Sequence, residues 1–544
     1  MSVDGYSGTI PGLLAAAAER DEHRVWLHSD RGTLTFGGTA AAVSLTISAL
    51  RDAGVSTGDL VMLTASNLPE YLLCWLALPS MGAVCVAVNP RSTPAELAGL
   101  IRQVAPSLLI TDESLAELVA AAQAEIGLRA GAESGAGAFP PIVAVDSIAP
   151  SEWSDPVAMA DAGRQAGLPG GAVTPDDLAV LIPTSGTTGR SKLVMQTHRA
   201  YAMAGEGFPY WMELTAADRL MTTLPLFHVN APAYSVMGSL ACGAGLVLAE
   251  RFSASRFLDI ARRHGATEFN AIGAMLEILM RQPEQPDDTD TPLRLCYTGP
   301  APERERQLEI EQRFGLRIVV GYAMSESPYG LIWARGARPY GTLGSIRQHP
   351  TLGTINEARV VDAASGNVLG EGGTGELELR NPVLTPGYLG MPEETAALMD
   401  GSWLRTGDLV TANADGTYTF LSRVKEVIRR RGENLSPLEV EEVLDSHSSV
   451  LECAVVGVAS ELSEEDVKAF VVPADGDRAL VDFGELQKFA AERLAAFKVP
   501  RYWQLIEELP RTPTARIAKH RLPAGHPPGE WDAEAPPDSA DGAQ

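Results

Sequence analysis

The sequence predicts an α/β protein with a largely parallel sheet, because strand-like and helix-like segments alternate along most of the chain. Asp59 to Thr64 and Ala83 to Val88 have strand patterns, and the helical pattern of Pro69 to Leu78 lies between them. The alternation resumes where Arg256 to His264 and Glu303 to Phe314 have helical patterns. Such alternation is typical of βαβ units. At 544 residues the chain is longer than one hydrophobic core usually serves, so we expect at least two domains.

Further segments extend this pattern in both directions. Ile10 to Ala18 predicts a first amphipathic helix, and Leu34 to Gly54 predicts a long Ala-rich helix. Leu178 to Ile182 is an apolar run typical of a buried strand, and Arg294 to Tyr297 and Ile318 to Val320 are further strands. The larger part of the chain is therefore expected to hold mixed and parallel sheets with flanking helices.

The pattern changes toward the C-terminus. From Ala358 to Phe420 the periodicity is short and strand-like, which predicts a small β subdomain. The helical segment Leu438 to Asp445 precedes strands such as Cys453 to Val458, which predicts a compact α+β domain. The acidic, Pro-rich end is typical of disorder. The predicted division is residues 1–423, residues 424–524 and a disordered tail of residues 525–544.

Composition restricts the partners. The net charge of -26 argues against nucleic acid or an anionic membrane surface, so an anionic nucleotide would need a locally positive pocket. The five cysteines are scattered without C-x-x-C spacing, so neither a disulfide framework nor a zinc site is expected. No apolar run approaches the roughly 20 residues that cross a membrane, and no basic residue precedes Ile10 to Ala18. We therefore predict a cytoplasmic protein.

A loop rich in hydroxyl groups and glycine follows the strand of Leu178 to Ile182. Residues 184–192 read Thr-Ser-Gly-Thr-Thr-Gly-Arg-Ser-Lys, in which glycines let backbone N–H groups approach an anion and the hydroxyls and Lys192 add donors. Such a loop can hold a triphosphate. Walker A spacing is absent, which disfavours ordinary P-loop enzymes. The alternative is a flexible Ser/Thr/Gly linker.

The loop resembles the phosphate loop of the adenylate-forming superfamily, which includes acyl-CoA ligases, luciferases and the adenylation domains of peptide synthetases. More motifs of that superfamily follow in its order. They are Pro225-Leu226-Phe227-His228, Tyr322-Ala323-Met324-Ser325-Glu326, Gly375-Glu376-Leu377, Trp403 to Leu409, Arg423-Val424-Lys425-Glu426, Gly432 to Pro437 and Pro510 to Thr514. One such motif is weak, but this many in order are hard to obtain by chance.

The resemblance implies a chemistry and assigns residues to it. A carboxylic acid is first converted into a mixed anhydride with AMP, and a thiol then displaces AMP. Glu326 is assigned to the Mg²⁺ that bridges the phosphates of ATP, Ser325 to the α-phosphate, and Asp408 with nearby Arg423 to the ribose hydroxyls, since a carboxylate accepts two hydrogen bonds from a diol. The β- and γ-phosphates are assigned to Thr184, Ser185, Gly186, Thr187, Thr188 and Lys192. The alternatives are a turn cap for Asp408 and a surface carboxylate for Glu326.

The same resemblance indicates where the acid binds. Phe227 and His228 would shape the mouth of the acyl pocket, with a core histidine satisfied by the backbone as the alternative for His228. Adenine and the acyl group would lie against Tyr297, Thr298, Gly299, Gly321 and Tyr322. The small residues Asn230, Ala231 and Gly273 would line the acyl cavity.

Rotation of the C-terminal lid is expected to separate the two half-reactions. Lys425 occupies the hinge position, although a surface lysine has the same local sequence. Gly432 would give the pantetheine arm of CoA room beside the backbone. Arg429, Arg430 and Arg431 are candidates for the CoA phosphates, or a solvated basic face.

One departure from the superfamily lies near the C-terminus. Related sequences read Pro-x-x-x-x-Gly-Lys, with a lysine that reaches the carboxylate and α-phosphate during adenylation, whereas this chain has Ala515 and Arg516 there. Arginine keeps the charge, but its planar fork is larger than an ammonium group. Lys519 could replace the lysine only if the loop were reshaped.

These observations favour an acyl-CoA ligase-type enzyme that forms a thioester from CoA and an acyl-adenylate, with adenylation weak or lost and the acyl-adenylate made by a separate enzyme. The first alternative is a complete ligase that uses ATP and Mg²⁺ and tolerates Arg516. A peptide-synthetase module is less favoured because no carrier domain follows the lid. A further alternative is a non-catalytic protein that binds an acyl-adenylate, against which the hinge Lys425 and Gly432 argue.

Overall fold

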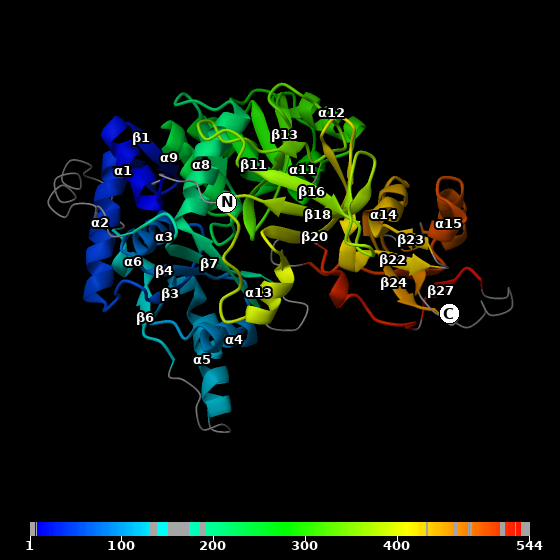
Figure 1. The fold of residues 1–544 in the computed structure, drawn as a ribbon, viewed down its shortest axis with the longest axis horizontal. Helices are drawn as coiled ribbons and strands as arrows, with labels where there is room; N and C mark the ends of the chain where they lie inside the picture. The colour runs from blue at the N-terminus through cyan, green and yellow to red at the C-terminus, as the bar shows by residue number, and fades with distance from the viewer. Residues whose placement is uncertain are drawn as a thin grey trace. The chain divides into compact units, whose positions relative to one another are not determined.

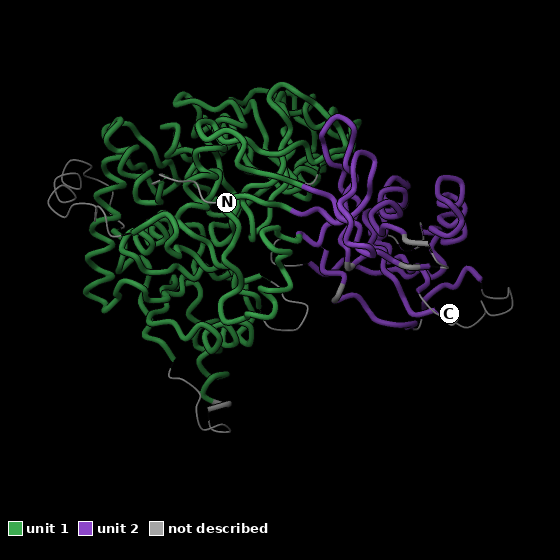
Figure 2. Tube along the Cα trace, viewed as in Figure 1, with its two compact units in different colours: residues 1–358, 379–405 green, residues 359–378, 406–544 purple. Residues whose placement is uncertain are grey.

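The structure is a computed structural model. It describes residues 6, 8–130, 139–150, 173–184, 191–299, 301–430, 433–460, 465–476, 478, 481–511, 517–527 and 529–534. These residues form two compact units, which Figure 2 colours separately. Unit 1 comprises Met1–Ala358 and Leu379–Arg405, and unit 2 comprises Arg359–Glu378 and Thr406–Gln544.

Unit 1 contains a nine-stranded sheet in the order β15-β14-β13-β12-β11-β9-β10-β1-β2. Its strands are β1 (Val25–Ser29), β2 (Gly32–Thr35), β9 (Arg219–Thr222), β10 (Gly245–Leu248), β11 (Glu268–Ile272), β12 (Leu295–Gly299), β13 (Arg317–Met324), β14 (Ser327–Ile332) and β15 (Ser345–Ile346). Strands β13 through β1 pair in parallel, and antiparallel strands lie at both edges. The carboxyl ends of the parallel strands therefore share one edge, where open α/β sheets bind ligands.

A second sheet of unit 1 has six strands in the order β6-β5-β3-β4-β7-β8. Its strands are β3 (Leu60–Thr64), β4 (Val84–Ala87), β5 (Leu108–Thr111), β6 (Ile142–Ala144), β7 (Leu178–Thr184) and β8 (Lys192–Thr197). All neighbours pair in parallel except β7 and β8, which form an antiparallel hairpin. This hairpin carries both ends of the predicted phosphate loop.

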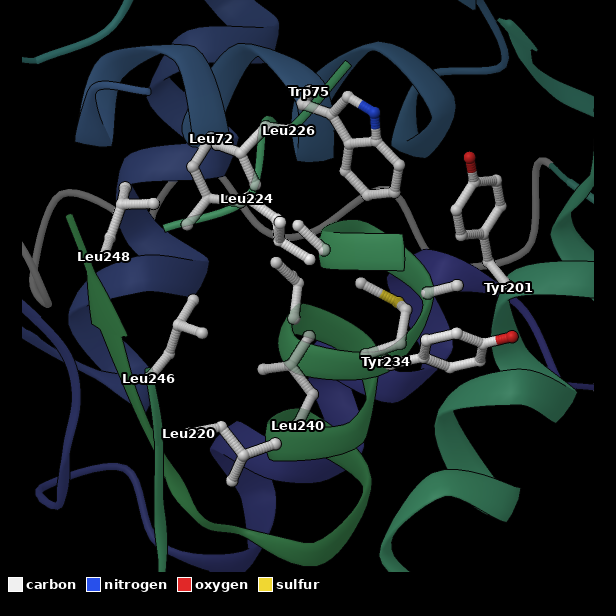
Figure 3. Close-up of a cluster of buried hydrophobic side chains, with 14 of the residues drawn as sticks. Leu72, Trp75, Tyr201, Leu220, Leu224, Leu226, Tyr234, Leu240, Leu246 and Leu248 are labelled. Carbon is white, nitrogen blue, oxygen red and sulfur yellow. The ribbon is translucent and has the colours of Figure 1, made fainter. Parts of the chain in front are cut away.

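Helices lie against these sheets (Figure 1), and their buried residues supply much of the core. They are α1 (Ile10–Arg20), α2 (Phe36–Asp52), α3 (Pro69–Ser80), α4 (Pro94–Val104), α5 (Ala116–Ala130), α6 (Val145–Ile148), α8 (His198–Met212), α9 (Met237–Cys242), α10 (Phe257–His264), α11 (Gly273–Met280), α12 (Arg304–Phe314) and α13 (Pro392–Leu398). Every residue of α3 is buried, because this helix contacts α1 and α2 as well as β3, β4 and β7. Leu72 and Trp75 of α3 lie in one apolar cluster with Leu246 and Leu248 of β10 (Figure 3).

Further strands follow α12 and β15. A six-stranded sheet contains β16 (Glu357–Val361), β17 (Val368–Leu369), β18 (Thr374–Arg380), β19 (Met399–Asp400), β20 (Trp403–Ala412) and β21 (Tyr418–Arg423). The C-terminal part contains β22 (Ile428–Arg430), β23 (Glu433–Leu435), α14 (Pro437–Asp445), β24 (Val450–Ala459), β25 (Glu465–Pro473), α15 (Phe483–Ala491), β26 (Tyr502–Leu505) and β27 (Trp531–Asp532). The predicted β subdomain and compact α+β region are thus observed. The predicted boundary at 423/424 stays a prediction.

The described part of the tail differs from the predicted disorder. Strand β27 pairs with β26, and Arg501 holds Asp532 through Nε–Oδ1 and Nη2–Oδ2 contacts of 2.9 and 3.0 Å. The fully buried Lys468 pairs with Glu530 and donates to the Gly525 carbonyl at 2.9 Å. Composition indicated disorder because the acidic residues have no partners in the local sequence, but their cations are Lys468 of β25 and Arg501, which directly precedes β26. Residues 535–544 lie outside the described part of the chain.

The described helices include none that is both long and apolar enough to cross a membrane.

The core of unit 1 contains a carboxyl group, that of Glu268, whose oxygens have no hydrogen-bond partner among the described residues. Glu268 of β11 is 0% exposed. Burial, and then the charge of Asp218, raise the pKa of Glu268 well above its usual range. The folded state therefore keeps this proton at a pH where the unfolded chain has lost it. The resulting contribution to stability is complete below the unfolded pKa and is lost as pH rises through the folded pKa.

We expect Glu268→Gln, which keeps the shape and removes the titration, to flatten the fall in unfolding free energy above pH 5. The wild-type fall is up to about 1.4 kcal/mol per pH unit for this one group. Thermal or denaturant unfolding from pH 5 to pH 8 measures it, with the exposed Glu117→Gln as the matched control. Equal pH slopes for wild type and Glu268→Gln would contradict the assignment of a protonated carboxyl.

Candidate active site

The hairpin of β7 and β8 brings together the two ends of the predicted phosphate loop. Thr184 and Lys192 are register partners, and the Thr184 hydroxyl donates to the Lys192 carbonyl at 3.3 Å. The loop that they bracket has a strand on each side, unlike a linker that connects two domains. Ser185, Gly186, Thr187 and Thr188 lie outside the described residues, so their contacts with phosphate stay a prediction.

A tyrosine connects Lys192 to Glu326. The Lys192 ammonium lies 4.6 Å from the centre of the Tyr388 ring, and the Tyr388 hydroxyl donates to Glu326 Oε1 at 2.8 Å. Glu326 is 9% exposed. Burial, and then the adjacent Glu326 charge, raise the pKa of Tyr388, so its proton remains in the hydrogen bond. The predicted phosphate ligand and the predicted metal ligand therefore share one small polar cluster.

Backbone pairing fixes the position of Tyr388. Tyr388 forms an antiparallel bridge with Val194 of β8, supported by Met195 N to Gly387 O at 3.0 Å and Leu389 N to Leu193 O at 2.9 Å. Gly387 has a φ of 134°, and a Cβ there would lie 2.3 Å from Thr395 Cγ2, so only glycine fits. Sequence reasoning missed Tyr388, since the preceding Pro386-Gly387 dipeptide signals a turn but not what its neighbour contacts.

Glu326 and Ser325 form the connection between β13 and β14. The side-chain amide of Gln196 in β8 donates to the Ser325 carbonyl, and Thr385 N donates to the Glu326 carbonyl at 2.8 Å. Neighbouring segments on both sides thus fix this turn. Glu326 lies in one cluster with Lys192, and Ser325 directly precedes it, while their contacts with ATP and Mg²⁺ stay a prediction.

The predicted adenine and acyl contacts lie at the carboxyl ends of β12 and β13. The two strands are parallel, with Thr298 opposite Val320. A Cβ on Gly299 would lie 2.5 Å from the Gly321 carbonyl oxygen, so this close approach requires glycine. The buried Thr298 hydroxyl has no hydrogen-bond partner among the described residues. An unsatisfied buried hydroxyl at this edge fits a site that completes its hydrogen bonds with a ligand.

The remaining acyl-pocket candidates lie at the ends of neighbouring elements. The Phe227 and His228 rings are 4.4 Å apart between centroids, and His228 N donates to the Pro225 carbonyl at 3.2 Å. Asn230 accepts from the Asn270 amide of β11 at 2.7 Å and directly precedes a π-helical turn, Ala231–Val236. Such turns are rare and frequently occur at functional sites. Gly273 begins α11 directly after β11.

Asp408 and Arg423 form an ion pair in unit 2. They are cross-strand partners in β20 and β21, and Arg423 Nε lies 2.7 Å from Asp408 Oδ1. Asp408 is only 2% exposed, and its backbone N–H donates to the Thr406 hydroxyl at 3.1 Å. This is a buried strand carboxylate rather than a turn cap. The pairing supports the predicted association of Asp408 with Arg423, while their contact with ribose stays a prediction.

The comparisons with known proteins identify the family. A family model described as "AMP-binding enzyme" matches residues 14–389, and one described as "AMP-binding enzyme C-terminal domain" matches residues 439–516. The chain belongs to the AMP-binding enzyme family. It is 30% identical over 487 residues to the crotonobetaine/carnitine–CoA ligase of Salmonella heidelberg (strain SL476), covering 86% of this chain and 89% of that relative. The predicted membership of the adenylate-forming superfamily, among acyl-CoA ligases, is confirmed.

Solved structures agree with this assignment. ATP-bound MatB from Rhodopseudomonas palustris matches with a TM-score of 0.80 at 25% identity, over 94% of this chain and 97% of that one. The anthranilate CoA ligase AuaEII in complex with anthranoyl-AMP matches with a TM-score of 0.82 at 22% identity, over 96% and 98% of the two chains, and shows the shared fold. The predicted α/β architecture with a large N-terminal and a smaller C-terminal domain is confirmed.

The donor set of this family member fits Mg²⁺ carried by ATP. Among the described residues no group of three or more His, Cys, Asp or Glu side chains could hold a metal ion. Mg²⁺ usually keeps several waters and is held by one or two carboxylates together with substrate phosphates. Glu326 can supply that one carboxylate, and the bound nucleotide would supply the remaining charge.

Two of the basic residues in the C-terminal region have partners within it. Arg430 is 4% exposed, pairs through Nε with Asp466 Oδ1 at 3.0 Å, and donates to the carbonyls of Phe497 and Val499. This buried network argues against the predicted contact of Arg430 with CoA, because the guanidinium is already satisfied. Lys519 Nζ lies 2.7 Å from Glu441 Oε1 and 3.7 Å from Glu426 Oε2. That pairing argues against Lys519 as a replacement for the missing lysine.

The other predicted residues of this region are only partly described. Lys425 lies in a short 3₁₀ segment, Val424–Glu426, and its side chain is outside the described part, as are Arg431, Gly432 and Arg516. The base of the loop that carries Arg516 is described: Arg511 and Ile517 form an antiparallel bridge, and Ala518 N donates to the Pro510 carbonyl at 2.6 Å. The hinge role of Lys425, the role of Gly432 and the contact of Arg431 stay predictions.

We expect Tyr388→Phe to weaken MgATP binding by about tenfold or more, since losing a hydrogen bond to a charged group costs about 1.5–3 kcal/mol. The ring under Lys192 remains, so the effect reports on the Glu326 contact alone. Calorimetric titration with ATP at several Mg²⁺ concentrations measures the change and should show a higher Mg²⁺ requirement. The exposed Tyr210→Phe is the matched control. A folded Tyr388→Phe protein with wild-type affinity and Mg²⁺ dependence would remove Tyr388 from the site.

Proposed function

We propose that this protein is a complete AMP-forming acid–CoA ligase. A carboxylate oxygen of the acid attacks the α-phosphorus of ATP and pyrophosphate leaves, giving an acyl-adenylate. The thiol sulfur of CoA then attacks the acyl carbon, AMP leaves, and the thiol proton passes to solvent. The observation that carries the proposal is the Lys192–Tyr388–Glu326 cluster, which retains a cation and a carboxylate suited to MgATP.

Each half-reaction has its own residues in this proposal. Mg²⁺ would neutralise the phosphate charge when it is bound with ATP. Lys192 and the loop hydroxyls hold the phosphates, and Ser325 holds the α-phosphate. Arg423 stabilises the charge of Asp408, whose carboxylate accepts from the ribose hydroxyls. Phe227 and His228 border the acid, while Lys425 and Gly432 serve the thioester step.

Adenylation also needs a cation near the reacting carboxylate and α-phosphate. Lys519 is engaged by Glu441 and Glu426, so we assign this task to Arg516. The bridge between Arg511 and Ile517 is described on either side of the segment that contains Arg516. A positioned guanidinium can stabilise the charge that develops in the transition state.

The second candidate is an enzyme that makes only the thioester from a preformed acyl-adenylate supplied by a separate adenylating enzyme. The replacement of the expected lysine by Arg516, with Ala515 before it, favours this candidate. Relatives that bind ATP favour the complete ligase. The two candidates differ in one measurable property, which is ATP–pyrophosphate exchange dependent on an acid.

We expect the wild-type protein to catalyse this exchange with at least one acid from a broad panel. Arg516→Ala should lower exchange by about 100-fold, because one lost transition-state contact costs about 2.7–4 kcal/mol. The same variant should convert synthetic acyl-adenylate and CoA into thioester at nearly the wild-type rate. Lys519→Gln, the control, should leave exchange nearly unchanged.

Absence of exchange with every acid, together with thioester formation from synthetic acyl-adenylates, would establish the second candidate. Loss of exchange in Lys519→Gln but not in Arg516→Ala would transfer the adenylation role to Lys519. ATP–pyrophosphate exchange in Arg516→Lys shows whether adenylation needs the shape of the guanidinium group or only its positive charge.

A further inference from the structure

A fully buried arginine lies behind the predicted acyl contacts of β12 and β13. Arg347 follows β15 and is 0% exposed. Its Nε donates to the Leu331 carbonyl at 3.0 Å, and its Nη1 donates to the Tyr234 hydroxyl at 2.7 Å and to the Pro328 carbonyl at 3.0 Å. Nη2 donates to the Tyr297 hydroxyl. All four acceptors are formally neutral.

The charge of Arg347 is thus not matched by a carboxylate. Among the described residues none forms an ion pair with Arg347 within 4.0 Å. The rings of Trp211 and Tyr234 lie 4.6 and 5.1 Å from its guanidinium carbon and give partial compensation. A buried cation without an anionic partner is costly. This cost suggests that a negatively charged group of the ligand interacts favourably with the Arg347 cation when the ligand is bound.

The guanidinium faces Gly321. A Cβ added to Gly321 would lie 2.9 Å from Arg347 Nη2 and 2.6 Å from Tyr297 Cε2. A guanidinium has five N–H donors, of which the four described hydrogen bonds use four, and the remaining N–H is on Nη2. The available donor and the charge thus lie beside Gly321 of β13, a predicted contact of the acyl group.

We propose that Arg347 is a specificity-determining residue that selects the acid by the charge of its acyl group. This inference rests on the proposed function and on the predicted acyl contacts of Gly321 and Tyr297. Arg347 favours an acid that carries a second carboxylate, and it disfavours an acid that carries a quaternary ammonium group. Tyr234 and Tyr297 position the guanidinium, and Tyr234 also borders the apolar cluster of Figure 3.

Charge acts strongly here because the surroundings are apolar and buried. At a given distance, an interaction between full charges is stronger in a low-dielectric interior than in water. A site with hydrogen-bond donors strongly rejects an analogue that leaves those donors unpaired. An apolar pocket discriminates less strongly between ligands that differ only in size. We therefore expect discrimination of at least about tenfold between neighbouring members of a charge series.

The test uses non-hydrolysable acyl-sulfamoyladenosine analogues, which report binding without requiring catalysis. Three analogues of equal chain length carry a terminal carboxylate, a terminal methyl group or a terminal trimethylammonium group. Calorimetry with the full-length wild-type protein should rank them carboxylate, methyl and trimethylammonium in order of decreasing affinity. Arg347→Met should abolish the ranking, and Arg347→Lys should retain it. Tyr297→Phe, which removes the acceptor that positions Nη2, should weaken the carboxylate analogue more than the other two analogues.

Equal affinities for the three analogues in the wild-type protein, or tightest binding of the trimethylammonium analogue, would overturn the inference. An unchanged ranking in a folded Arg347→Met protein would overturn it as well. If the Arg347 variants do not fold, the ranking by the wild-type protein and the effect of Tyr297→Phe still test the inference. A ranking by charge without ATP–pyrophosphate exchange would contradict the complete ligase but support the inference. Failure of all three analogues to bind would overturn both the adenylate site and the inference.

Discussion

Pairing between β8 and residues 387–389 is the constraint on which the candidate site depends. One strand supplies Lys192 at its start and Gln196 near its end, while the paired segment supplies Tyr388. The turn with Ser325 and Glu326 contacts both segments. Three stretches that lie 62 residues or more apart along the chain therefore hold the predicted phosphate cation, the predicted metal carboxylate and the hydroxyl between them. Backbone hydrogen bonds pair β8 with residues 387–389, and the side chains of Gln196 and Tyr388 connect this pair to the turn.

The sequence predicted elements whose signals are local. Apolar runs indicated β3, β4 and β7, and the Ser/Thr/Gly-rich loop indicated Thr184 and Lys192 as candidate phosphate contacts. Tyr388 and Arg347 carried no such signal, because their importance comes from partners distant in sequence. An isolated tyrosine after a Pro-Gly turn and an isolated arginine after a short strand are ordinary surface patterns. Only the three-dimensional contacts distinguish them.

The basic residues of the C-terminal region show the same difference between what the local sequence indicates and what the contacts show. Arg430 belongs to a run of three arginines that resembles an exposed cationic face, yet it is buried between Asp466 and two carbonyls. Lys519 lies close to the missing lysine in sequence but is paired with Glu441. A local pattern gives the charge of such residues and not their partner. The adenylation chemistry of this chain therefore has to be assigned by what each cation contacts.

The ordered tail affects how the boundaries of the C-terminal domain should be chosen. The family match ends at residue 516, whereas β27 covers the outer strand β26. A chain ended near residue 516 would expose the hydrogen-bonding edge of β26, and such open edges promote association with other chains. It would also leave the ammonium of Lys468 buried without Glu530. Chimeras that exchange this domain at the family boundary would consequently be prone to aggregation, whereas an exchange that carries residues through 534 would keep the sheet edge closed.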